Sequence, residues 1–459
     1  MMNIVNPATG EVIRKLKEDG KSSLQKKGER LHKAQKEWAE TPLEERIACL
    51  QRFKHLLEVN KEELATTLTL EVGKPIREAR NEIDGACYRV QFFLDHAKKT
   101  LLPQTIHEIS GVREVLDFDP LGVIVHLSAW NYPYLIAMNV LPPALIAGNA
   151  VLYKPSEFAT LSGLHIQNLL YQSGVPKEVS QTAIGGERTG KALLELPFDG
   201  YFFTGSYPTG QSISKVLAGR LVPQVLELGG KDPLYVTEDV DIPWSAAAAV
   251  EGSFYNAGQS CCAVERIYVH QGVYEKFIVA FREEIKKLKM GNPLNEDTTL
   301  GPVTRAAHLP VLTRQIQDAV RRGARLLTGG KKVSGKGNFF EPTVLTKVNH
   351  TMRIMKEETF GPLIGIQKVK NDEEAIRLMQ DTEYGLTAAV FSKNEERARG
   401  ILKKLNVGTG YWNCCDRVSP FLPWSGRKHS GLGATLSTQG ILAFIRPKSY
   451  HLRNHPAYR

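Results

Sequence analysis

The sequence lacks the long apolar runs that membrane-spanning helices need. Its most hydrophobic stretches, such as residues 123–130 and 246–250, are far shorter than the about 18 residues required. No apolar segment follows the first charged residues of the N-terminus, so we expect no secretory signal. Hydrophobic residues make up 42% and charged residues 24% of the chain, a usage that excludes disordered and fibrous proteins. With 459 residues, the chain should form a globular protein of about three structural units outside the membrane.

The cysteines match neither a disulfide framework nor a metal site. They stand at positions 49, 87, 261, 262, 414 and 415. Adjacent cysteines rarely bridge each other, and the spacing fits no zinc pattern. No cluster of histidines, cysteines and carboxylates has the spacing of metal ligands either. We therefore expect reduced thiols, a cytoplasmic location and no metal.

Positive charge is in excess but is not concentrated. Lysine and arginine total 59 against 49 aspartates and glutamates, which gives a net charge of +10. These basic residues form no block of five, and no nucleic-acid-binding motif accompanies them. We expect a solvated basic surface and no nucleic-acid partner.

Helical periodicity fills residues 20–100. Leu24, Leu31 and Trp38 share one helix face, and apolar residues repeat in the same way over 43–57. The sequence TPLE at 41–44 predicts a capping box with proline at the first helical position.

From about residue 120, apolar β-branched runs alternate with helical patterns. The strand candidates lie at residues 122–127, 150–154, 181–186, 200–206, 224–230, 266–271, 324–330, 339–348, 363–369 and 387–392. This alternation indicates two α/β units, each with a parallel sheet covered on both faces. A ligand of such a sheet lies at the carboxyl ends of its strands. Residues 105–118 and the tail after Phe444 are predicted to form an appendage of strands outside these units.

Cys261 is the candidate nucleophile. It follows a glycine-containing turn between a small-residue helix and the strand at 266–271. Backbone amides at such a turn favour the thiolate, which is the reactive form of cysteine. Taken alone, a buried structural cysteine is an open alternative. We assign the neighbouring Cys262 no catalytic role.

Two polar residues stand at the ends of predicted strands. Glu227 precedes two glycines, and desolvation there would raise its pKa towards that of a general base. An ion pair with Lys231 is the alternative. Asn131 has two alternatives as well, because its amide could donate to an oxyanion or could cap the helix that begins near Pro133.

Two further strand ends have features of a nucleotide site. Gly205 and Ser206 lie in a turn between a strand and a helix, where amides can hold a pyrophosphate. The turn lacks the GxGxxG spacing, so it is a weak signal by itself. Lys154 and Glu157 could bind sugar hydroxyls or could form a surface ion pair of little worth.

The order of these motifs resembles that of the aldehyde dehydrogenase superfamily. They are residues 130–133 (WNYP), 154–157 (KPSE), 203–206 (FTGS), 227–231 (ELGGK), 256–261 (NAGQSC) and 357–362 (EETFGP). The ELGGK segment followed by the GQSC segment is specific to this family. The likeness extends from Asn6 to Gly433, essentially the whole chain.

The resemblance implies both a fold and a reaction. The fold would be α/β, with two doubly wound α/β domains and a small β oligomerisation arm. Cys261 would attack an aldehyde carbon, and Asn131 with the Cys261 backbone amide would stabilise the oxyanion. After hydride transfer to a nicotinamide, Glu227 would activate water to hydrolyse the thioester. The implied activity is NAD-dependent oxidation of an aldehyde to a carboxylic acid.

The resemblance also implies a cofactor site. The residues that match it are Trp130, Lys154, Glu157, Gly205, Ser206, Glu358 and Phe360. Lys154 and Glu157 match positions at the adenosine ribose, the turn at 205–206 matches the pyrophosphate position, and residues 358 and 360 match the nicotinamide ribose. Because the Glu157 carboxylate would repel a 2′-phosphate, NAD is expected, with NADP as the alternative. Tyr207 departs from the threonine that usually follows Ser206.

The implied domains follow the chain order. Residues 1–104 and 119–229 would form the NAD-binding domain, and 230–425 the catalytic domain. Residues 105–118 and 426–459 would form the oligomerisation arm and the C-terminal segment. Since isolated strands are not stable, we expect a homodimer or homotetramer.

The substrate is less constrained than the reaction. Relatives that oxidise succinate semialdehyde often carry arginine eight residues after the oxyanion asparagine, where this chain has Asn139. Arg417 could meet an acidic tail instead, whereas Tyr132 and Trp424 would give aromatic walls that suit neutral aldehydes. We favour a general aldehyde. Succinate semialdehyde is the first alternative, and a CoA-acylating or non-catalytic relative is the second.

Overall fold

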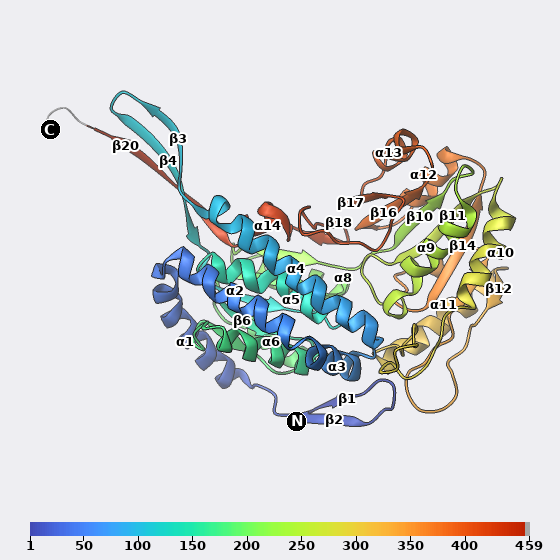
Figure 1. The fold of residues 1–459 in the computed structure, drawn as a ribbon, viewed down its shortest axis with the longest axis horizontal. Helices are drawn as coiled ribbons and strands as arrows, with labels where there is room; N and C mark the ends of the chain where they lie inside the picture. The colour runs from blue at the N-terminus through green and yellow to red at the C-terminus, as the bar shows by residue number, and fades with distance from the viewer. Residues whose placement is uncertain (455–459) are drawn as a thin grey trace.

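The chain begins with a small hairpin and a helical layer in a computed structural model that describes residues 1–454 (Figure 1). The hairpin is β1 (Met2–Val5) with β2 (Val12–Leu16), and the helices are α1 (Lys21–Glu40), α2 (Leu43–Val59), α3 (Lys61–Val72) and α4 (Ile76–Leu101). The predicted face of α1 is buried at Leu24, Leu31 and Trp38, which confirms the periodicity.

The capping box predicted at residues 41–44 is wrong. Thr41 Oγ1 donates a hydrogen bond to the Glu37 carbonyl at 3.0 Å, and α2 begins at Leu43 without a side-chain cap. Only two residues separate the helices, and both the amide and the hydroxyl of Thr41 donate to the Glu37 carbonyl in the last turn of α1, so the hydroxyl does not cap α2.

The first large sheet has six strands in the order β19-β9-β8-β5-β6-β7. They are β5 (Val123–Leu127), β6 (Ala150–Lys154), β7 (Ser180–Thr182), β8 (Gly200–Thr204), β9 (Gln224–Glu227) and β19 (Gly431–Leu432). All neighbours are parallel except β19 and β9. The chain winds from β5 to β7 in one direction and through β8 and β9 in the other, so a crevice opens at the carboxyl ends beside β5.

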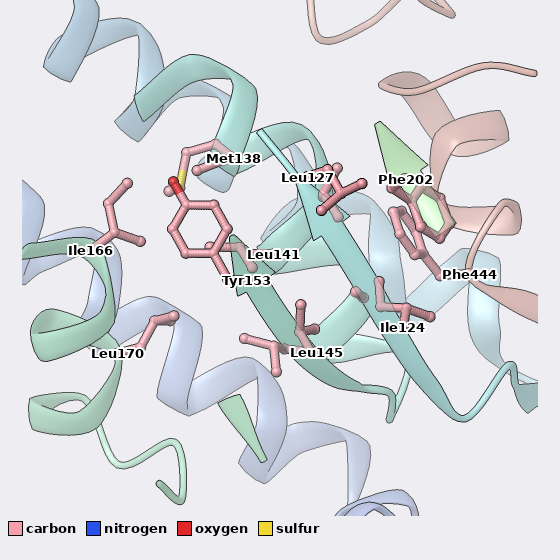
Figure 2. Packing of buried hydrophobic residues seen from close by; sticks show 14 of the residues in the cluster. Ile124, Leu127, Met138, Leu141, Leu145, Tyr153, Ile166, Leu170, Phe202 and Phe444 are labelled. Carbon is pink, nitrogen blue, oxygen red and sulfur yellow. The ribbon is translucent and has the colours of Figure 1, made fainter. Parts of the chain in front are cut away.

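Apolar side chains join this sheet to its crossover helices. These are α5 (Pro133–Ile146), α6 (Thr160–Gln172), α7 (Glu187–Glu195) and α8 (Tyr207–Leu217). Figure 2 shows Leu141 of α5 and Leu170 of α6 in one cluster with Tyr153 of β6. Farther across the sheet, the rings of Phe202 and Phe444 stack with centroids 4.4 Å apart. This packing fixes where the strands end, and therefore where the polar residues after them lie.

The second large sheet has seven strands in the order β12-β13-β14-β11-β10-β16-β17. They are β10 (Asp232–Val236), β11 (Val264–His270), β12 (Arg325–Thr328), β13 (Thr343–Thr346), β14 (Leu363–Val369), β16 (Thr387–Phe391) and β17 (Thr409–Trp412). Its helices are α9 (Ile242–Phe254), α10 (Tyr274–Ile285), α11 (Leu309–Arg321), α12 (Asp372–Gln380) and α13 (Glu395–Leu402). Only β12 pairs antiparallel. The buried central strand β10 was not predicted, because its first residues, aspartate and proline, favour turns.

A third sheet, in the order β20-β4-β3, protrudes from the body of the molecule (Figure 1). Its strands are β3 (Gln104–Ile109), β4 (Val112–Pro120) and β20 (Ile445–Arg453), all antiparallel. The predicted appendage is therefore confirmed. Of the predicted segment 426–459, β19 joins the first sheet, α14 (Ser437–Leu442) follows it, and residues 455–459 lie outside the described residues.

None of the helices within residues 1–454 combines the length and the hydropathy that crossing a membrane requires.

Candidate active site

A cavity of about 570 Å³ lies at the carboxyl ends of the first sheet. The predicted site residues that line it are Trp130, Asn131, Gly205, Ser206, Glu227, Cys261, Glu358 and Phe360. These residues come from distant segments of the sequence, and the fold brings them to one place. Lys154 and Glu157 do not line this cavity.

A hydrogen-bonded loop presents Cys261 to the cavity. Helix α9 ends in a 3₁₀ turn, η1 (Tyr255–Gly258), where Asn256 and Ala257 have left-handed φ angles of 50° and 54°. Such angles in non-glycine residues cost about 1–3 kcal/mol each, so the surroundings must enforce them. Asn256 Nδ2 donates to the carbonyls of Asn131 (3.1 Å) and Gln259 (3.2 Å), which ties the loop to the end of β5. The loop thus holds Cys261 half-buried beside Asn131.

The side-chain amide of Asn131 has one N–H donor that is not used in the described fold. Its Nδ2 donates to the Gln259 carbonyl at 3.1 Å, and the residue before α5 is Tyr132, so Asn131 does not cap that helix. The Nδ2 atom makes this one hydrogen bond, and the Cys261 backbone N–H makes none, within residues 1–454. Two N–H groups therefore remain for an oxygen that gains negative charge nearby.

Glu227 is the last residue of β9 and is 7% exposed. Thr435 Oγ1 donates to its Oε1 at 3.0 Å, whereas Oε2 has no hydrogen-bond partner within residues 1–454. Burial raises the pKa of Glu227 to about 8, although the Thr435 hydrogen bond and the Arg89 charge oppose the shift. A carboxyl group with this pKa can exchange a proton near neutral pH, as a general base must.

Lys231 does not pair with Glu227, so that alternative is wrong. Its Nζ donates to Glu265 Oε2 and Thr359 Oγ1, both at 2.8 Å. Glu265 also accepts hydrogen bonds from the backbone amides of Thr359 and Phe360. The buried lysine therefore holds the segment at 358–360 in place and forms no ion pair with Glu227.

Glu358 and Phe360 lie against the turn after β9. Glu358 Oε1 accepts a hydrogen bond from the Gly230 amide at 3.1 Å, and a Cβ atom on Gly229 would collide with the Glu358 carboxylate. Gly229 thus permits the approach of Glu358, whereas a Cβ atom on Gly230 would collide with the Cys261 carbonyl. Phe360 contacts Trp130 edge to face, with ring centroids 5.5 Å apart. These three side chains form one wall of the cavity.

The Cys262 thiol is hydrogen-bonded and has a raised pKa, which makes it a poor nucleophile. Its Sγ donates to Asp416 Oδ1 at 3.1 Å, and Ser260 Oγ donates to the same oxygen at 2.7 Å. A contact with the Cys261 thiol, then burial and the charge of Asp416, raise the pKa of the Cys262 thiol. Cys262 therefore stays protonated, whereas Cys261 lies next to the free N–H donors.

The turn at Gly205 and Ser206 connects β8 to α8. The Gly205 amide donates to the Glu227 carbonyl at 3.0 Å, so this amide belongs to the sheet and not to a ligand. Ser206 is the N-cap residue of α8 and is exposed, and the first amides of a helix have no partner within it. Tyr207 stacks on His429, with ring centroids 3.7 Å apart.

Lys154 is the last residue of β6, and Glu157 follows it at the same edge of the sheet. Lys154 Nζ lies 3.8 Å from Glu157 Oε2 and donates to the Pro155 carbonyl at 3.0 Å. The Lys154 side chain is 9% exposed and that of Glu157 is 38% exposed, so the pair is not a contact between two surface side chains. Burial lowers the pKa of Lys154. The carboxylate of Glu157 remains accessible to a ligand.

Sequence reasoning missed three residues of this site. Asn256 lies within a recognised motif, so its bracing role could have been suspected. Thr435 and Arg89 belong to no motif, and 208 residues separate Thr435 from Glu227. No local pattern can indicate contacts of that range.

Comparisons with known proteins are consistent with this geometry. The sequence profile of the aldehyde dehydrogenase family matches residues 1–450. The chain is 34% identical to succinate-semialdehyde dehydrogenase [NADP(+)] of Deinococcus radiodurans, over 97% of this chain and 93% of that protein. It is 34% identical to glutarate-semialdehyde dehydrogenase of Pseudomonas putida, with the same coverage. The structure of betaine aldehyde dehydrogenase from Staphylococcus aureus in complex with NAD+ has a TM-score of 0.95 at 31% identity, covering 99% of this chain and 92% of that one.

Proposed function

Since the chain belongs to the aldehyde dehydrogenase family, we propose that the cavity beside Cys261 is its active site and that Cys261, Glu227 and Asn131 carry the reaction. The enzyme oxidises an aldehyde to a carboxylic acid, with a nicotinamide dinucleotide as the oxidant and water as the source of the added oxygen. The observation that carries the proposal is that a thiol, a buried carboxyl group and an amide donor from three segments line one cavity.

The first step forms a covalent bond to the enzyme. The Cys261 thiolate adds to the aldehyde carbon, and the carbonyl electron pair moves onto oxygen. Asn131 Nδ2 and the Cys261 amide donate to this oxyanion, and one such donor is typically worth ~3 kcal/mol of barrier. The hydrogen bonds of Asn256 and Gln259 hold these donors in place before the substrate arrives.

The residues around the cavity fit a nicotinamide dinucleotide. The N-terminus of α8 after Ser206 suits a pyrophosphate, and Lys154 with Glu157 suits the hydroxyls of a ribose. Trp130, Glu358 and Phe360 suit the nicotinamide end, and Gly205, which lines the cavity at the start of the turn before α8, would leave room there for the phosphates. When bound, the dinucleotide supplies the acceptor for the hydride that leaves the former aldehyde carbon.

Glu227 completes the reaction by hydrolysis. It takes a proton from water, the water oxygen attacks the thioester carbon, and the C–S bond breaks to release the acid and the thiolate. The unpartnered Oε2 and the pKa of about 8 support this role. A buried base next to the thiol favours hydrolysis over CoA acylation, and it argues against a non-catalytic protein.

The two large sheets support an assignment of cofactor binding and of the nucleophile to different domains. We assign cofactor binding to residues 1–104 and 119–229, which contain β5–β9, and the nucleophile to residues 230–425, which contain β10–β17. Residues 105–118 with the C-terminal segment form the protruding sheet. All six cysteines are free, which supports a cytoplasmic location.

The choice of cofactor can be tested together with the activity itself. With a panel of aldehydes, we expect kcat/KM for NAD to exceed that for NADP by at least about tenfold, because Glu157 repels a 2′-phosphate. Glu157→Gln should raise kcat/KM for NADP by about tenfold. Absorbance of the reduced cofactor is the measurement, and Glu178→Gln, an exposed glutamate before β7, is the control. Failure of every aldehyde to reduce either cofactor would refute the proposed function.

The protruding sheet supports a homodimer or homotetramer. Ile106 and Ile109 of β3 are 62% and 56% exposed, and such apolar strands are typical of association surfaces. We expect light scattering at micromolar concentration to give the mass of two or four chains of 51.1 kDa. Changing both isoleucines to aspartate should lower this mass, whereas Val279→Asp on α10 should not. A monomeric wild-type protein is the contrary result.

A further inference from the structure

A buried arginine with unused donors lines the active-site cavity. Arg89 of α4 is 5% exposed. Its Nη1 donates to the Leu135 carbonyl at 2.8 Å and to Asn139 Oδ1 at 2.6 Å, both on α5. Its Nε and Nη2 atoms form no hydrogen bond and no ion pair with residues 1–454, and neither atom is fully enclosed by protein. The free edge of the guanidinium is therefore open to the cavity.

The carboxyl groups near Arg89 do not neutralise it. Glu82 forms a buried ion pair with Lys74 and accepts a hydrogen bond from the Tyr134 amide at 2.8 Å. Glu227 has a pKa of about 8 and is largely protonated at neutral pH. Burial lowers the pKa of Arg89 only to about 10, so the guanidinium stays charged. A buried cation without a counter-ion is unfavourable, and an anion from solution would relieve this.

Apolar side chains share the cavity wall with Arg89 and Cys261. They include Leu135, Ile136, Val418 and Trp424. Arg417 at the same cavity is a weaker candidate for binding an anion, because it already donates to Glu251 at 3.0 Å and its side chain is 63% exposed. A cation and a thiol in one cavity with apolar side chains suit an aldehyde that has a short aliphatic spacer and an anionic end.

We propose that Arg89 binds a carboxylate on the substrate, so that the enzyme prefers aldehydes with a short carboxylate-bearing tail. Nε and Nη2 lie on one edge of the guanidinium, and two parallel N–H donors match the two oxygens of a carboxylate. Nη1, bonded to α5, holds this edge in position. The inference rests on the proposed function of the same cavity and adds the class of substrate to it.

The test compares two substrates of the same spacer length, one with a carboxylate and one in which a methyl ester removes the charge. Succinate semialdehyde carries the carboxylate, and methyl 4-oxobutanoate is its neutral ester of the same spacer length. Wild-type kcat/KM should favour the acid by at least about tenfold. Arg89→Leu should lower kcat/KM for the acid by about 100-fold and change that for the ester by less than about threefold. Arg89→Lys should restore part of the loss, because it returns the charge without the fork.

The controls separate binding from structure. Arg77→Leu makes the same exchange at an exposed position of α4 and should leave both substrates unaffected. Arg417→Ala should not alter the ratio of the two kcat/KM values. Calorimetry with succinate on the free enzyme gives a readout without turnover, and the affinity should fall by at least about tenfold in Arg89→Leu.

The inference is overturned by any of three results. The first is a wild-type enzyme without preference for the acid. The second is an equal loss on both substrates in Arg89→Leu, which indicates a role in structure or in tuning Glu227. The third is a preference that depends on Arg417 instead. In all three cases the ester still reduces the cofactor, whereas a failed proposed function would leave both substrates unreactive.

Discussion

Replacement of Cys261 by alanine should lower kcat with every aldehyde by at least about 10⁴-fold, because it removes the sulfur on which we propose that the covalent adduct forms. The hydrogen bonds that hold the loop join the side chains of Asn256 and Gln259 to backbone carbonyls and do not involve the Cys261 side chain. The variant should therefore keep the fold. Reduced-cofactor absorbance gives the rate, and the melting temperature checks that the fold is intact.

The neighbouring thiol provides the matched control. Cys262→Ser keeps a donor towards Asp416, which now accepts from the Cys262 thiol at 3.1 Å. This variant should retain activity within about threefold, since the raised pKa of the Cys262 thiol keeps it protonated and its Sγ donates to Asp416. If activity survives in Cys261→Ala and disappears in Cys262→Ser, the nucleophile is Cys262, and the assignment of Cys261 is wrong.

Glu227→Gln should separate the two halves of the reaction. Glutamine has nearly the same shape and can still accept from Thr435, but it cannot take a proton from water. We expect steady-state kcat to fall by about 10²–10⁴-fold, while the first turnover still reduces one cofactor per active site. Rapid-mixing absorbance measures this burst. A slow reaction without a burst would mean that Glu227 acts before the thioester forms.

The same residue sets the dependence of hydrolysis on pH. A general base works when deprotonated, so the rate should rise with pH and reach half its maximum near the Glu227 pKa of about 8. Thr435 donates to the carboxylate and so favours its charged form, and Thr435→Val should therefore move the midpoint to higher pH. The Glu227→Gln profile should be flat over this range.

The fold could be predicted where each strand is a continuous apolar run bounded by glycine or proline. β5, β6 and β14 are of this kind, because both faces of their sheets are covered by helices. β10 escaped prediction because Asp232 and Pro233 look like a turn, although the Asp232 side chain is buried and accepts hydrogen bonds from Thr387. Tertiary partners of this kind are not visible in a local pattern.

The site residues also fall into those that a local motif indicates and those that only tertiary contacts reveal. Cys261, Glu227 and Asn131 lie in short motifs whose order is informative, so the sequence alone led to them. Arg89 was missed because an arginine on a helix normally faces solvent, and here α5 covers it instead. Asn139 stands where succinate-semialdehyde relatives often have an arginine, yet its Oδ1 accepts a hydrogen bond from Arg89, the arginine that we infer to bind the acid.

The most direct test of the central claim is peptide mass spectrometry of Glu227→Gln after mixing with an aldehyde and NAD. We expect the acyl group of the substrate on the peptide that contains Cys261, in an amount equal to the burst, and its loss when Cys261 is also changed to alanine. Cofactor reduction with no acyl group on Cys261, or with the acyl group on another residue, would contradict the account.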